Sequence, residues 1–147
     1  MQVPENYRWR DGPVEAGPAV VFDMDGVLSD ASSRQHYLEF PRRDWEAFFA
    51  ACGEDELVDE VARLLECLDP DLRIILLTAR PMRVQRQTLG WLDRYKLRWD
   101  VLIMREYGDY GRNVQNAVDR SPLGPLSAEQ LGLTQHGLQV HWCDRIS

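Results

Sequence analysis

The sequence predicts an α/β protein built on a mostly parallel sheet. Short apolar runs rich in β-branched residues alternate with amphipathic helical segments, in the order strand, helix, strand, helix, strand. That order is typical of a parallel sheet joined by right-handed crossovers. Acidic and hydroxyl side chains directly follow the first two apolar runs, and the carboxyl ends of such strands are where these sheets bind ligands.

Residues 1–18 hold three prolines and two glycines and are predicted to be an irregular lead-in. The first strand is predicted at residues 19–22, where the apolar run AVVF meets the acidic DMD. Residues 41–52 have helical spacing, with Gly53 as the stop. The side chains of this segment that we expect to face the core are Trp45, Phe48, Phe49 and Cys52.

A longer helix is predicted over residues 55–68, before the breaker Asp69-Pro70-Asp71. Its apolar face comprises Leu57, Val58, Val61, Leu64, Leu65 and Leu68. Residues 73–77 form the next predicted strand, and a helix follows to about Tyr95. The inward residues of that helix are Val84, Thr88, Trp91, Leu92 and Tyr95. A third strand is predicted over residues 99–104.

The pattern weakens after Tyr107. Residues 108–126 have little periodicity and many turn formers, and the alternating run LQVHW predicts a short last strand over residues 138–142. A length of 147 residues fits one domain, so we expect residues 1–147 to form a single unit with a poorly matched part at 108–147.

Composition excludes several classes of protein. The net charge of −7 argues against an extended nucleic-acid surface. The three cysteines lack the spacing of a zinc knuckle or a disulfide framework, so reduced thiols and a cytoplasmic location are expected. The polar N-terminus does not resemble a signal peptide, and no apolar run is long enough for a membrane helix. The oligomeric state is not predicted.

The segment from Asp23 to Asp30, DMDGVLSD, carries the strongest chemical signal. Asp23 and Asp25 lie two residues apart after a buried strand, and Gly26 allows a sharp turn. Two close carboxylates are unfavourable unless a cation joins them or one keeps a proton, and Mg²⁺ fits such oxygen ligands. A calcium loop, a glycosyltransferase D-x-D or a surface acidic turn are the alternatives, although the EF-hand order is absent.

This segment resembles the first motif of the haloacid dehalogenase superfamily, D-x-D-G-x-x-x-D, and IILLT, ending at Thr78, is similar to the second. Within that superfamily, LTARP, RDW and WDVLIMRE resemble the phosphatase domain of polynucleotide kinase. The likeness runs from about residue 18 to 107. It implies a Rossmann-like three-layer α/β/α fold with a small or absent cap, and a Mg²⁺-dependent phosphomonoesterase acting on a nucleotide or a nucleic-acid 3′-phosphate end.

The resemblance also implies roles for matching residues. Asp23 would be the nucleophile that forms an aspartyl-phosphate, and Asp25 the general acid and base. Mg²⁺ would bind the Asp23 carboxylate and the Asp25 carbonyl. Thr78 and the Ala79 amide would hold phosphoryl oxygens, although a helix N-cap is an alternative role for Thr78. Arg80 is a further candidate for substrate binding.

Six arginines occur in the two segments that should flank this site, and a local basic rim favours a nucleotide or a nucleic-acid end over a long duplex. They are Arg34, Arg42, Arg43, Arg80, Arg83 and Arg86.

The last third departs from the superfamily pattern. Lys96 is the only lysine and precedes the third strand, where it is typical of a surface helix end rather than of the third motif. Arg112 or Arg120 could replace it. VHWCDR resembles the fourth motif, so Asp144 is the candidate third metal ligand. The tail is either a divergent ending with a functional Asp144 or not family sequence, and a catalytically impaired protein that binds phosphate or a partner is the alternative function.

Overall fold

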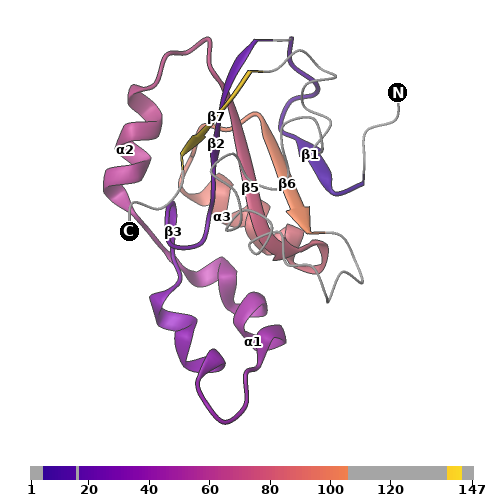
Figure 1. Ribbon diagram of the computed structural model, residues 1–147, viewed down its shortest axis with the longest axis vertical. Coiled ribbons are helices and arrows are strands. Elements are labelled where there is room, and N and C mark those ends of the chain that lie inside the picture. The colour runs from indigo at the N-terminus through magenta and orange to yellow at the C-terminus, as the bar shows by residue number, and fades with distance from the viewer. Residues whose placement is uncertain (1–4, 16, 106–138, 144–147) are drawn as a thin grey trace.

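The computed structural model describes residues 5–15, 17–105 and 139–143, the last of these only as a strand of the sheet. Its main sheet has five strands in the order β1-β6-β5-β2-β7 (Figure 1). The four parallel strands are β6 (Val101–Arg105), β5 (Arg73–Pro81), β2 (Pro18–Phe22) and β7 (Gln139–Cys143). The sheet therefore confirms the mixed α/β class with a mostly parallel sheet.

Alternate residues of the central strands enter two apolar clusters, as the two faces of a strand require. Ile74 and Leu76 of β5 belong to the larger cluster, and Ile75 and Leu77 belong to the smaller. The larger cluster also contains side chains from α2 (Asp59–Cys67) and α3 (Gln85–Arg94). Helices α2 and α3 thus cover one face of the sheet.

Between β2 and α2 the chain forms a small helical lobe, residues 32–54, beyond the carboxyl ends of the strands (Figure 1). It consists of the 3-10 helix η1 (Ser32–Leu38), α1 (Trp45–Ala50) and the 3-10 helix η2 (Ala51–Glu54). Two short antiparallel strands, β3 (Ser29–Asp30) and β4 (Glu56–Leu57), close its base. The short insertion predicted from the sequence is therefore a compact lobe.

The prediction that residues 1–18 are irregular is wrong in part. Strand β1 (Tyr7–Trp9) pairs antiparallel with β6, and Tyr7 and Trp9 pack against the smaller cluster. Tyr-Arg-Trp has the period of two that a strand with one buried face requires, and the prolines of the segment lie outside it.

Two predicted core residues are exposed instead. Leu64 is 49% exposed, because α2 starts at Asp59 and turns Ala62 and Leu65 inward, while the preceding Leu57 belongs to β4. Trp45 is 44% exposed at the first turn of α1, whereas Phe48, Phe49 and Cys52 are buried as predicted.

The predictions for the remaining elements agree with the structure to within a few residues. Helix α3, after the short 3-10 helix η3 (Met82–Val84), buries Thr88, Trp91 and Leu92, and the last strand is present as β7. Strand β5 runs on to Pro81, with an irregularity in its pairing between Leu77 and Pro81. None of the helices within the described ranges has the length and apolarity that a membrane crossing needs.

Candidate active site

The acidic loop turns sharply at the carboxyl end of β2. The carbonyl of Met24 accepts hydrogen bonds from the amides of residues 27–29, and Gly26 has a φ of +81°. Such a φ favours glycine, so this position explains why a glycine follows the two aspartates. The Met24 amide donates to Oδ1 of Asp23 at 2.7 Å, and the Met24 side chain is fully buried.

Asp25 is held by two buried arginines. Its Oδ1 accepts Nη2 of Arg34 at 2.8 Å, and Nε and Nη2 of Arg80 at 3.1 and 2.7 Å. Its own side chain remains 22% exposed. Burial raises the pKa of this carboxyl, but the nearby charges and hydrogen bonds of Arg80 and Arg34 outweigh burial and lower the pKa below its ordinary value of 3.8. The free protein therefore holds Asp25 as a carboxylate at neutral pH.

Asp55 completes what we call the buried ionic cluster: Asp25, Asp55, Arg34 and Arg80. Its two carboxylate oxygens accept Nε and Nη2 of Arg34, both at 2.6 Å, and Nη2 of Arg80 lies 3.4 Å from Oδ2. The Ser29 hydroxyl donates to the same Oδ2. Two cations and two anions balance, so the cluster places no net charge in the interior, where an unpaired charge is costly.

Residues distant in sequence bring this cluster together. Arg34 comes from η1, where its Nη1 donates to the carbonyl of Phe48 at 3.0 Å and its guanidinium lies over the Phe48 ring at 4.4 Å. The backbone carbonyl of Asp55 accepts Nε1 of Trp91 at 2.8 Å. The lobe, the acidic loop and α3 thus meet at the buried ionic cluster, in which the side chain of Asp25 is partly exposed.

The predicted substrate-binding residues lie at the end of β5. Thr78 is buried, and its Oγ1 accepts a hydrogen bond from the Arg80 amide at 3.1 Å. This bond closes a local turn and is not a helix N-cap, because α3 begins only at Gln85. Ala79 is half-buried. Arg80 has no exposed surface, and its guanidinium also reaches Thr88 and Ser29. Phosphate binding by these three residues stays a prediction.

The predicted metal ligands are only partly within the described residues. Asp23 and Asp25 lie together at the end of β2, and β7 runs alongside with Cys143 opposite Phe22. Asp144 lies outside the described residues, and among those described no group of three His, Cys, Asp or Glu side chains is placed to hold a metal ion. The oxygen atoms of Asp23 and Asp25 are nevertheless of the kind that Mg²⁺ prefers.

Lys96 is far from these residues. It follows α3 at the amino ends of the parallel strands, its side chain is 82% exposed, and its nearest carboxylate is that of Asp93 at 3.9 Å. This position confirms the prediction of a surface helix end. Arg112 and Arg120, the proposed substitutes, lie outside the described residues.

Sequence reasoning missed Asp55 and Ser29, and it placed Arg34 only in a general basic rim. Asp55 is one of many acids between Glu54 and Glu60, so composition gives it no special status. Asp55 lies between the end of the lobe at Glu54 and strand β4, where the chain returns from the lobe.

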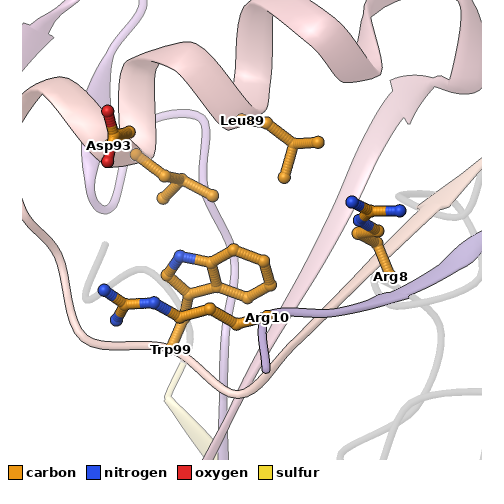
Figure 2. A pocket seen from close by; sticks show the side chains of 6 residues that line it. Arg8, Arg10, Leu89, Asp93 and Trp99 are labelled. Carbon is orange, nitrogen blue, oxygen red and sulfur yellow. The ribbon is translucent and has the colours of Figure 1, made fainter. Parts of the chain in front are cut away.

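A separate shallow pocket of about 240 Å³ lies at the opposite end of the strands. Figure 2 shows Arg8 and Arg10 of the β1 side facing Leu89 and Asp93 of α3, with the Trp99 ring between them. Arg10 is engaged there, since its Nη1 donates to the carbonyl of Leu97 at 3.2 Å. None of the predicted site residues lines this pocket.

Comparison with solved structures identifies a shared fold. One chain of a Pnkp1/Rnl/Hen1 complex aligns with a TM-score of 0.60 and 23% identity, over 91% of this chain and 40% of that chain. A chain of a Pnkp1/Rnl/Hen1 RNA repair complex aligns with a TM-score of 0.57 and 18% identity, over 97% of this chain and 47% of that chain. The protein thus spans less than half the length of either chain, and at these identities the likeness concerns the fold alone.

No protein-family model matches the sequence, and no curated protein sequence is significantly similar to it.

Proposed function

We propose that the protein is a phosphoric monoester hydrolase that uses Mg²⁺ and an aspartyl-phosphate intermediate, acting on a nucleotide or a nucleic-acid 3′-phosphate end. The observation that carries this proposal is the pair of aspartates at the carboxyl end of β2, of which Asp25 is fixed by Arg34 and Arg80. A positioned nucleophile beside an oriented acid–base group is the minimum that transfer through a covalent intermediate requires.

In the first step a carboxylate oxygen of Asp23 attacks phosphorus, the bond to the leaving oxygen breaks, and Asp25 donates a proton to that oxygen. In the second step a water attacks the aspartyl-phosphate while Asp25 takes the water's proton, and inorganic phosphate leaves with Asp23 restored. Bound Mg²⁺ would supply positive charge beside the phosphoryl oxygens. Asp23, the Asp25 carbonyl and Asp144 are the residues that would hold it.

The charge of Asp25 must change between these steps. Arg80 and Arg34 outweigh burial and lower its pKa, so the group is held as the carboxylate, the form that can accept a proton from water. A dianionic phosphate bound beside Asp25 raises the pKa again, because a neighbouring like charge disfavours ionisation. Substrate binding therefore favours the protonated form that the first step requires.

Two further observations support the proposed substrate class and the proposed fold. The two similar structures are chains of Pnkp1/Rnl/Hen1 complexes, and one of these is described as an RNA repair complex. That description agrees with a role at nucleic-acid ends. The strand order is compatible with the three-layer fold of the haloacid dehalogenase superfamily, because β2, the strand before the two aspartates, lies in the interior between β5 and β7.

Free cysteines at positions 52 and 67 support a cytoplasmic location.

The test is hydrolysis of p-nitrophenyl phosphate and of a 3′-phosphorylated nucleotide by the wild type and by Asp23→Asn, with Mg²⁺ or with EDTA. We expect Mg²⁺-dependent hydrolysis that Asp23→Asn abolishes. The matched control is Asp59→Asn, at an exposed aspartate that begins α2. Activity that persists in Asp23→Asn overturns the nucleophile. Tight phosphate binding without any hydrolysis favours the alternative, a catalytically impaired phosphate-binding protein.

A further inference from the structure

The far end of the helical lobe exposes an aromatic side chain next to two exposed arginines. The tip, residues 40–45, joins η1 to α1 and forms the end of the lobe in Figure 1. Phe40 is 96% exposed, which is unfavourable because a large apolar ring stays in contact with water. Arg42 and Arg43 are also exposed and make no ion pair with any residue that the structure describes.

The tip is rigidly connected to the candidate active site. The Trp45 ring stacks on Phe49 with centroids 5.9 Å apart and meets the edge of Phe48 at 5.7 Å. Phe48 in turn packs against Arg34, which binds Asp25. Arg105, at the carboxyl end of β6, lies over the Phe49 ring at 5.5 Å. This continuous packing fixes the lobe at the edge of the sheet where Asp23 lies.

The reach of the lobe matches a few nucleotides. From Arg34, the 3-10 helix and the two residues after it carry the chain at most about 15 Å to Phe40. Stacked nucleotides of one strand are spaced by about 3.4 Å, so the path from Arg34 to the tip spans at most about four or five nucleotides. A short single strand is therefore long enough to run from Arg34 to the tip.

We propose that the tip binds the single strand that leads away from the reacting 3′-phosphate, with a base stacked on Phe40 and backbone phosphates on Arg42 and Arg43. This inference rests on the proposed nucleic-acid substrate. Aromatic faces and arginines side by side are what single-stranded nucleic acids bind, and stacking accepts any base. Asp44 caps α1 by accepting a hydrogen bond from the Ala47 amide, and Glu39 and Glu46 flank the tip. These acids offset the two arginines, so the charge around the tip is near neutral and suits a short nucleic-acid end rather than a long polyanion.

Binding is measured by fluorescence anisotropy with a 3′-phosphorylated single-stranded hexanucleotide, in an Asp23→Asn background that prevents turnover. Base stacking predicts that Phe40→Ala weakens binding by about 5- to 150-fold and that Phe40→Trp restores it. The logarithm of the association constant falls as the logarithm of the salt concentration rises, and Arg42→Ala and Arg43→Ala should each make this slope less steep by about 0.7. Leu64→Ala and Arg63→Ala, exposed residues of α2, are the matched controls and should change neither quantity.

Hydrolysis separates this inference from the proposed function. With Asp23 intact, Phe40→Ala should raise KM for the hexanucleotide and leave p-nitrophenyl phosphate hydrolysis unchanged. Equal hexanucleotide binding by Asp23→Asn with and without Phe40→Ala overturns the tip as a strand-binding surface, whatever the activity. Absence of all hydrolysis together with Phe40-dependent binding overturns the proposed reaction and supports the tip.

Discussion

At the scale of single residues, the state of Asp25 follows from its two arginine partners. Desolvation alone would favour a neutral acid, yet Arg80 and Arg34 reverse the direction and hold a carboxylate. The same arginines also face Asp55, so each guanidinium divides its hydrogen bonds between two acids. A fork of this kind suits arginine and not lysine, because a single ammonium cannot span both carboxylates.

Replacement of Asp25 should depend on the leaving group. We expect Asp25→Asn to slow hydrolysis of a nucleoside 3′-phosphate by about 10²- to 10⁴-fold, because the sugar oxygen needs a proton as it leaves. p-Nitrophenolate leaves without that proton, so Asp25→Asn should release one equivalent in a rapid burst and then stall at the aspartyl-phosphate. Stopped-flow absorbance measures the burst. A loss of equal size for both substrates in the first turnover contradicts the acid role.

The same residue should make stability depend on pH. The folded pKa of Asp25 is lower than its ordinary value of 3.8, so the folded state binds fewer protons. The stabilisation from Asp25 is then fully present above about pH 4–5 and is lost as pH falls through the folded pKa. Urea unfolding should show the difference in stability between wild type and Asp25→Asn narrowing from pH 6 to pH 3. A constant difference contradicts the assignment.

At the scale of elements, α3 ends in a turn for which its sequence is not ideal. The Lys96 amide donates to the Asp93 carbonyl and the Leu97 amide to the Leu92 carbonyl, which is the Schellman pattern. Lys96 has a φ of +53°, where a side chain is strained and glycine is favoured. Buried Leu97 and Leu92 supply the apolar contact that accompanies this ending.

Lys96→Gly should therefore raise the free energy of unfolding by up to about 1 kcal/mol. The exposed pair that Lys96 makes with Asp93 is too long and too solvated to offset this gain. Thermal melts of wild type and Lys96→Gly measure the change, and phosphatase activity should be the same in both. Loss of activity in this variant would give the lysine a catalytic role that its position does not support.

At the scale of the whole molecule, one arginine joins three separate parts of the chain. Arg34 of the lobe binds Asp25 of the acidic loop and Asp55 before β4, and it also donates to Phe48 of α1. Removing it leaves two buried carboxylates to share Arg80. The lobe and the sheet are therefore expected to lose stability together.

We expect Arg34→Met to cost about 3–5 kcal/mol in the free energy of unfolding, the usual effect of breaking a buried ion pair. Arg63→Met, at an exposed position of α2, is the control and should change stability by at most about 0.5 kcal/mol. Urea unfolding at pH 7 measures both. Similar values for the two variants would mean that Arg34 contributes little to holding the lobe.

The sequence predicted the elements whose periodicity is strong and whose ends carry clear signals. The strands before Asp23 and Thr78 are unbroken apolar runs that pack on both faces of the sheet, and helix α3 buries one face at helical spacing. Strand β1 was missed because three residues between prolines and glycines are too few to reveal a period. Leu64 was misplaced because the start of α2, which sets its face, depends on the pairing of Leu57 with Ser29.

The candidate site was predictable only as far as it is local in sequence. Asp23, Asp25 and Gly26 form one motif, and the turn at Gly26 follows from the glycine itself. The link between Arg34 and Asp55 depends on tertiary contacts across 21 residues, and no local pattern encodes it. Phosphate binding by Thr78, Ala79 and Arg80 and metal binding by Asp144 stay predictions.

The isolated lysine also has a practical consequence for experiments in solution. Lys96 is the only side-chain amine in this sequence, it is well exposed, and it lies at the amino ends of the strands, away from Asp23 and Asp25. Amine-reactive esters modify the α-amine of the chain as well as lysine, but a fluorophore or a solid support that is attached to a side chain in this way can be at one position alone, Lys96. Molecules coupled through Lys96, with the α-amine blocked, are held by the amino ends of the strands and leave the carboxyl edge of the sheet and the lobe facing the solution.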